Sequence, residues 1–111
     1  YAEDVDLCRR LEAAGWEIWY CGEAELTHVG GGSSAARPAE AGIAAVVSLA
    51  RLFEKWDGAR RAGLYRAGVM ALSALKLILV APAAPFSAAA RRKLALHRQL
   101  IAALREEGRH V

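Results

Sequence analysis

Three acidic residues near the start of the chain have the type and spacing of a catalytic group. Glu3, Asp4 and Asp6 open a stretch whose apolar residues repeat at helical spacing up to Gly15, a residue that can end a helix. A carboxylate suits the role of general base, because it is ionised at neutral pH and can take a proton from a hydroxyl as that oxygen forms a bond. Acids are also routine caps at helix starts. The three acids alone therefore indicate little about function.

A histidine and a glycine-rich segment form a second group that could do chemistry. His28 lies in an extended run, and residues 30–34 read Gly-Gly-Gly-Ser-Ser. Imidazole can bind a metal ion, while glycine amides and serine hydroxyls can approach phosphate oxygens. A lone histidine is more often structural, and a glycine–serine run is nearly as often a plain flexible linker.

In combination these residues resemble a known family. The order and spacing of Glu3 to Leu7, Gly15-Trp16 and Thr27 to Ser34 are similar to the second half of the catalytic domain of bacterial family 2 glycosyltransferases with the GT-A fold. The rhamnosyltransferase-like and galactofuranosyltransferase-like members are the closest in pattern. The resemblance covers residues 1–34 closely and 43–58 loosely. It implies an inverting enzyme of cell-wall and envelope polysaccharide synthesis, which transfers a sugar from a nucleotide-sugar donor to a glycan or lipid-linked acceptor.

The resemblance also implies roles for individual residues. Asp4 matches the catalytic base, and Glu3 is placed to orient Asp4 or to touch the acceptor. Asp6 matches a substrate-binding position, although Asp6 and Arg10 have the spacing of an i,i+4 helix pair, which we favour for Asp6. Three residues of the glycine–serine loop are further expected at the substrate: Gly31, Gly32 and Ser33.

A metal ion is implied as cofactor. His28 matches the histidine that, in metal-dependent members, joins an Asp-x-Asp motif in holding Mn²⁺ or Mg²⁺, which neutralises charge on the leaving diphosphate. The family's Asp-x-Asp motif and its nucleotide-binding strand–helix repeat would precede Tyr1 and are absent from this chain. We therefore expect the chain to be a fragment of a longer enzyme that alone neither binds a sugar nucleotide nor turns over.

The surrounding pattern predicts a mainly α chain with two short β-strands. Helices are expected over 4–14, 43–56, 59–81 and 87–107, and extended runs over 16–20 and 24–29. The resemblance makes residues 1–34 the C-terminal part of a Rossmann-like α/β GT-A domain, 35–42 a linker and 43–111 a helical tail. Cys8 and Cys21 are expected to be reduced, and their spacing does not favour zinc.

Charge divides the chain in two. Residues 1–40 hold eight acids and three bases, a net −5, whereas residues 41–111 hold four acids and twelve bases, a net +8. The run 59–81 is apolar, but Lys76 leaves it short of the roughly 20 nearly uncharged residues that span a bilayer. We expect it to lie in a membrane interface or against other helices, with Arg66, Ser73 and Lys76 on a polar stripe.

The basic tail suggests a location for the parent enzyme. Arg91, Arg92, Lys93 and Arg98 lie in the first half of the last helix, where cations oppose the helix dipole and favour an anionic partner such as a phospholipid surface. The enzyme is thus expected in the cytoplasm, peripheral to the inner face of the plasma membrane. A solvated basic face is the simpler alternative, and a non-enzymatic helical module that binds membranes or a partner is the rival function. Nucleic acid is not expected as a partner, because aromatic residues do not interleave with the bases.

Overall fold

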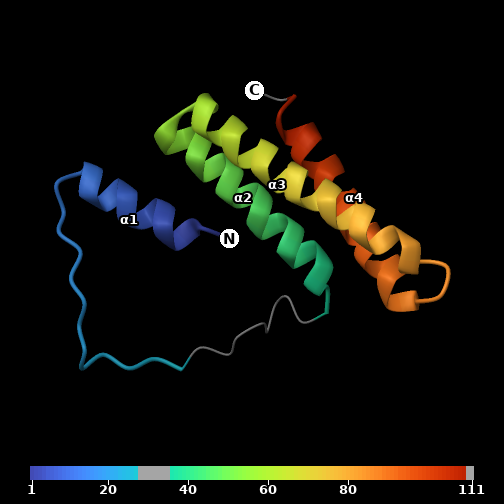
Figure 1. The fold of residues 1–111 in the computed structure, drawn as a ribbon. Coiled ribbons are helices and arrows are strands. Elements are labelled where there is room, and N and C mark those ends of the chain that lie inside the picture. The colour runs from blue at the N-terminus through green and yellow to red at the C-terminus, as the bar shows by residue number, and fades with distance from the viewer. Residues whose placement is uncertain (28–35, 110–111) are drawn as a thin grey trace.

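The computed structural model describes residues 1–27 and 36–109. Its helices are α1 (Glu3–Ala13), α2 (Pro38–Asp57), α3 (Ala59–Val80) and α4 (Ala88–Glu107), with a short 3-10 turn, η1 (Ala81–Ala83), after α3. In Figure 1 α3 runs antiparallel to α2 and α4 antiparallel to α3, while α1 lies beside α2 and runs in roughly the same direction as α2. The three long helices form one packed unit, to which α1 is attached.

Local sequence signals explain where the helices begin and end. Gly58 has φ +86°, a conformation that favours glycine, and it separates α2 from α3. Ser87 is the N-cap of α4, and its hydroxyl accepts a hydrogen bond from the amide of Ala90 at 3.3 Å. Pro82 and Pro85 prevent α3 from continuing. The predicted helices over 4–14, 59–81 and 87–107 are confirmed to within one residue at each end.

The core is small and built largely from alanine. Ala50, Ala62 and Ala90 are buried on α2, α3 and α4, and Leu104 of α4 is the largest side chain that is fully buried. Alanine lets the helix backbones approach closely, and Phe53 packs against Tyr65 with ring centroids 5.2 Å apart. The fold therefore depends on helix–helix contact over short side chains rather than on a large hydrophobic interior.

The predicted fold class is wrong for this chain. The described residues contain no β-strand, so they form an all-helical small domain and not an α/β Rossmann-like fold. Residues 16–20 and 24–27 lack helix but form no ladder; the last two residues of the second run, 28 and 29, lie outside the described part. Among residues 17–27 the backbone bond is from Ala24 N–H to the Cys21 carbonyl, at 3.3 Å. A strand needs a partner strand, and the described chain offers none.

Two further expectations are refined. α2 begins at Pro38, inside the segment 35–42 that the sequence assigns to a linker, because proline is favoured in the first turn of a helix. The polar stripe of α3 does not face solvent as a unit: Ser73 is buried, and Arg66 is half-buried and donates to Glu54 of α2 at 3.2 Å. Lys76 is exposed. The stripe thus marks mainly the side of α3 that packs against its neighbours.

The segment Ala59–Ala83 is long and apolar enough to cross a membrane, with a mean hydropathy of 1.7 over its most apolar window. From the sequence, we expect Lys76 to leave this segment too short to span a bilayer. By length and composition alone, the segment can span one. Little of this segment is buried in the fold. Large apolar side chains of α3 are therefore exposed on the surface of the fold.

Candidate functional site

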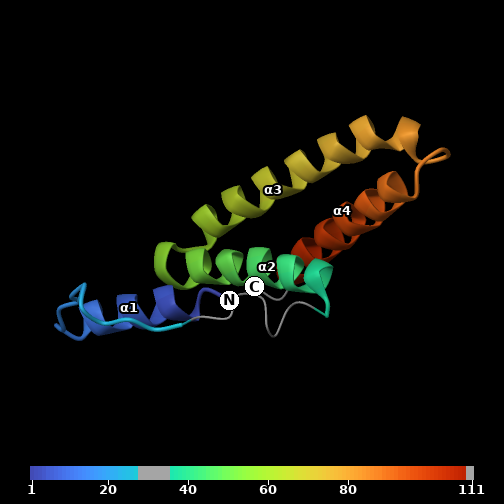
Figure 2. The ribbon, with the colours of Figure 1, turned by 90° about the horizontal axis from the view of Figure 1, so that it is seen from below.

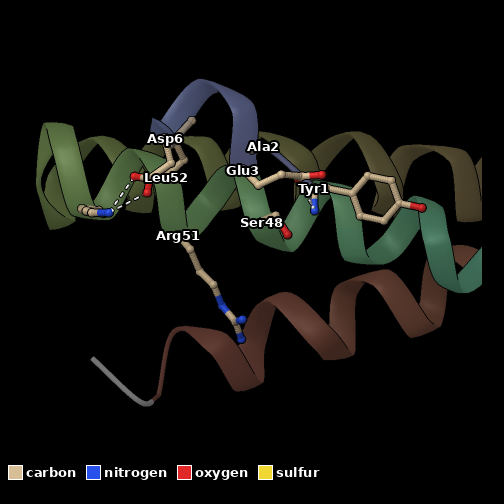
Figure 3. Close-up of a pocket in the computed structure, with 8 residues that line it drawn as sticks. Tyr1, Ala2, Glu3, Asp6, Ser48, Arg51 and Leu52 are labelled. Carbon is tan, nitrogen blue, oxygen red and sulfur yellow. Dashed lines mark hydrogen bonds and ion pairs between the residues drawn. The ribbon is translucent and has the colours of Figure 1, made fainter. Parts of the chain in front are cut away.

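The helix that carries the three acids is docked on α2 through Asp6. Lys55 donates to both carboxylate oxygens of Asp6, at 2.7 and 2.8 Å, and the indole N–H of Trp56 donates to Oδ1 at 2.7 Å. Arg10 lies 3.3 Å from Oδ2, which confirms the i,i+4 pair. Figure 3 shows Asp6 on α1 lying over α2, with dashed lines to the lysine. Asp6 is thus engaged on both oxygens within the fold.

A second ion pair holds the same two helices together. Arg9 donates to Asp57 at 3.3 Å and lies 5.9 Å above the ring of Trp56. Lys55 approaches the same ring at 5.4 Å. α1 buries no side chain completely, so these charged and cation–π contacts, rather than a shared apolar core, fix its position.

The electrostatics of Asp6 follow from these contacts. Hydrogen bonds from Lys55 and then Trp56 hold the pKa of the Asp6 carboxyl below its ordinary value of 3.8, because they favour the charged form. The structure therefore gives Asp6 a positioning role: it fixes the helix on which the other acids stand. Contact of Asp6 with substrate stays a prediction.

Asp4 is arranged differently from its neighbours. It lies in the first turn of α1, is exposed, and makes no ion pair or hydrogen bond with any residue that the structure describes. Glu3 is also exposed and pairs with the terminal amine of Tyr1 at 2.9 Å, which lowers the pKa of the Glu3 carboxyl. In the same turn Asp4 is exposed without a partner in the described chain, whereas Asp6 is bound on both oxygens.

A shallow cleft of about 200 Å³ lies between α1 and α2. Glu3 and Asp6 line it from α1, and Arg51 and Lys55 line it from α2 (Figure 3). Arg51 points away from α1 and binds Glu107 of α4 through two bonds of 2.7 and 2.8 Å. Since both cations are already paired with carboxylates, the cleft offers no unpaired positive charge to an anionic ligand. It is a junction between helices that leaves Asp4 on its outside.

Several predicted site residues lie outside the described residues. They are His28, Gly31, Gly32 and Ser33, so the structure does not place them relative to Asp4. Across residues 1–27 and 36–109 no three side chains of histidine, cysteine, aspartate or glutamate gather as a metal site would require. Cys8 and Cys21 are both free thiols. A Mn²⁺ or Mg²⁺ site at His28 therefore stays a prediction, and no chemical step below depends on it.

The contacts of Lys55 and Trp56 that anchor α1 were not predicted from the sequence. Lys55 and Trp56 lie in the predicted helix over 43–56, but nothing in their spacing indicates contact with Asp6. Comparison with known proteins adds no relative: no protein-family model, curated protein or solved structure matches the chain.

Proposed function

We propose that the chain is part of a glycosyltransferase in which Asp4 is the general base. The proposal starts from the resemblance of residues 1–34 to family 2 glycosyltransferases. The observation that carries it further is the contrast within one helical turn. Asp6 is bound on both oxygens and fixes α1 on α2, whereas Asp4 is exposed and has no partner in the described chain. A base needs such an open carboxylate, because the acceptor hydroxyl has to reach it within hydrogen-bonding distance.

The proposed reaction is a single displacement at the anomeric carbon of a nucleotide sugar. The acceptor oxygen attacks that carbon, and its proton passes to a carboxylate oxygen of Asp4 as the new bond forms. The bond from the anomeric carbon to the diphosphate oxygen breaks, and its electron pair leaves with the nucleoside diphosphate. Attack from the face opposite the leaving group inverts the configuration. The acceptor is a glycan or a lipid-linked sugar.

The supporting role of α2 is to hold the base still. A catalytic carboxylate has to stay within a fraction of an ångström of its productive position, and side chains on anchored helices meet this demand better than those on loops. Asp6 and Arg9 tie α1 to Lys55, Trp56 and Asp57. Asp4, two residues before Asp6, is thereby held at the fixed end of α1.

The test is an assay of nucleoside diphosphate release by the full-length protein in the presence of nucleotide sugars and acceptor. Asp4→Asn should lower the transfer rate by roughly 100-fold or more, since general-base catalysis contributes about that factor. Glu12→Gln is the matched control, because Glu12 is an exposed acid on the same helix with no partner in the described chain. Transfer by Asp4→Asn at the wild-type rate would remove Asp4 from the role of base.

A further inference from the structure

One side of α3 is apolar and exposed. Five large side chains on it are between 50 % and 70 % exposed: Leu64, Leu72, Leu75, Ile78 and Leu79. At about 100° per residue these positions fall within an arc of about 120° around the helix axis. We call this surface the α3 outer face. In Figure 2 α3 runs along one edge of the molecule, and α1 and α2 lie on the opposite side.

No charge interrupts the α3 outer face. Between residues 64 and 80 α3 carries two charged residues, Arg66 and Lys76, and the helical geometry puts both outside the arc. Arg66 turns to Glu54 of α2. In the turn after α3, Phe86 is a further exposed apolar side chain, at 90 %. An exposed apolar face that runs from Leu64 to Leu79 on a small domain indicates a binding surface.

Exposed cations bracket this surface at both ends. Arg60 lies just before it in the first turn of α3, and Arg91, Arg92 and Lys93 follow the turn that ends it. An apolar face flanked by basic residues is complementary to a bilayer with anionic head groups, which takes up the apolar side chains and attracts the cations. We propose that the α3 outer face docks on an anionic lipid bilayer, with α3 lying in the plane of the interface. This inference does not depend on the catalytic role of Asp4.

The packing of α4 decides between lying in the interface and crossing the bilayer. The 22 residues of α3 rise about 33 Å, so length alone permits a crossing. However, α4 returns antiparallel along α3 after a short turn and packs against it (Figure 2). A crossing by α3 would carry Arg98 and Arg105 of α4 into the hydrocarbon, where charged side chains are costly. Both arginines stay in water when α3 lies flat.

The docking test is flotation of the chain with vesicles of phosphatidylcholine and phosphatidylglycerol at 3:1, a ratio chosen as about one quarter anionic lipid. The double variant Leu72→Gln, Leu79→Gln should reduce the bound fraction roughly tenfold or more, because two large side chains lose their apolar contact without a change of charge. The matched control is Ile18→Gln, Leu26→Gln, which alters two exposed apolar residues outside α3 and should float like the wild type. Circular dichroism of each variant checks that the helices are retained.

Two further measurements test whether binding needs anionic lipid and whether α3 lies flat on the bilayer. Vesicles of phosphatidylcholine alone should bind the wild type several-fold more weakly, since they lack the charge that the cations meet. An amine reagent that cannot cross the bilayer, added outside preformed vesicles, should label both Lys55 and Lys93 when α3 lies flat. Labelling of Lys55 from outside, with Lys93 labelled only by reagent enclosed in the vesicles, would show a crossing and overturn the in-plane arrangement.

The docking proposal is overturned if the wild type does not float, or if the α3 double variant floats as well as the wild type. Sedimentation without lipid tests the other occupant of this face. A wild-type dimer that does not float, and that the α3 double variant converts to a monomer, would assign the surface to a second copy of the chain instead. A monomeric wild type that floats supports the lipid.

Discussion

Lys55 donates to both carboxylate oxygens of Asp6. This ion pair joins α1 to α2 through two residues that are 49 positions apart in the sequence. The contact separates two neighbouring acids by role. Asp6 is committed to the fold, because its oxygens also accept from Trp56 and lie beside Arg10. Asp4 stands two residues earlier on the same helix and is left open to solvent. The catalytic proposal depends on that division.

The first prediction concerns the anchoring of α1. Asp6→Asn should detach α1 from α2, because the amide loses the charge that Lys55 and Arg10 meet, while the packing of α2, α3 and α4 stays intact. Hydrogen–deuterium exchange measures this directly: amides of 3–13 should exchange like an unstructured peptide, with unchanged protection in the long helices. Asp4→Asn is the control and should leave exchange in α1 unaltered. Equal protection of α1 in both variants would contradict the anchoring role.

The same contact has a pH dependence whose sign is fixed. The pKa of the Asp6 carboxyl is lowered in the folded state, so its contribution to stability is complete above the ordinary value of 3.8 and is lost as the pH falls through the lower folded value. Docking of α1 should therefore weaken in acid below about pH 4. Titration followed by the fluorescence of Trp56, with Trp16→Phe and Trp19→Phe removing the other indoles, should show the change, and Asp6→Asn should abolish it.

A third prediction concerns the core. Leu104→Ala should lower the free energy of unfolding by about 2–5 kcal/mol, because Leu104 is only 1 % exposed and truncation leaves a cavity between α4 and its neighbours. Leu64→Ala, on the exposed side of α3, should change it by less than about 0.5 kcal/mol. Urea denaturation of both variants provides the measurement. Similar losses from the two substitutions would mean that Leu104 does not hold the helices together.

A fourth prediction concerns His97 at the packed side of α4. Its Nδ1 is buried without a hydrogen-bond partner in the described chain, and burial followed by the charge of Lys76 lowers the pKa of this histidine below 6.5. The unfolded histidine therefore binds a proton first as the pH falls, so stability should decrease as the pH falls below 6.5. The thermal midpoint should drop between pH 7.5 and pH 5.5, and His97→Leu should make the drop smaller. An identical drop in the variant would assign the effect to other groups.

Sequence signals that act over a few residues predicted the helices well. Ser87 caps α4 and Gly58 ends α2, close to the predicted helix bounds, since caps and glycine stops depend on local backbone bonds. The strands were wrong because the alternation of Trp16, Ile18 and Tyr20 describes side chains, whereas a strand also needs a partner for its backbone.

In the candidate site, too, contacts between residues close in sequence could be predicted and long-range contacts could not. The pair of Asp6 with Arg10 follows from i,i+4 spacing and could be predicted. The bonds from Lys55 and Trp56 to Asp6 link residues 49 and 50 positions apart, and no pattern within either helix encodes them. Those long-range bonds pair Asp6 and leave Asp4 exposed, so they decide which of the two acids is free in the described chain. The difference between the paired carboxylate of Asp6 and the exposed carboxylate of Asp4 is therefore visible only in the folded chain.

The most direct test of the central claim measures donor binding and sugar transfer on one preparation of the full-length Asp4→Asn variant. The amide cannot accept the acceptor's proton, but its size and the position of α1 are unchanged. We predict that the dissociation constant for the nucleotide sugar stays within about twofold of the wild type, while the transfer rate falls by roughly 100-fold or more. A transfer rate equal to that of the wild type, with donor binding intact, would contradict the assignment of Asp4 as the base.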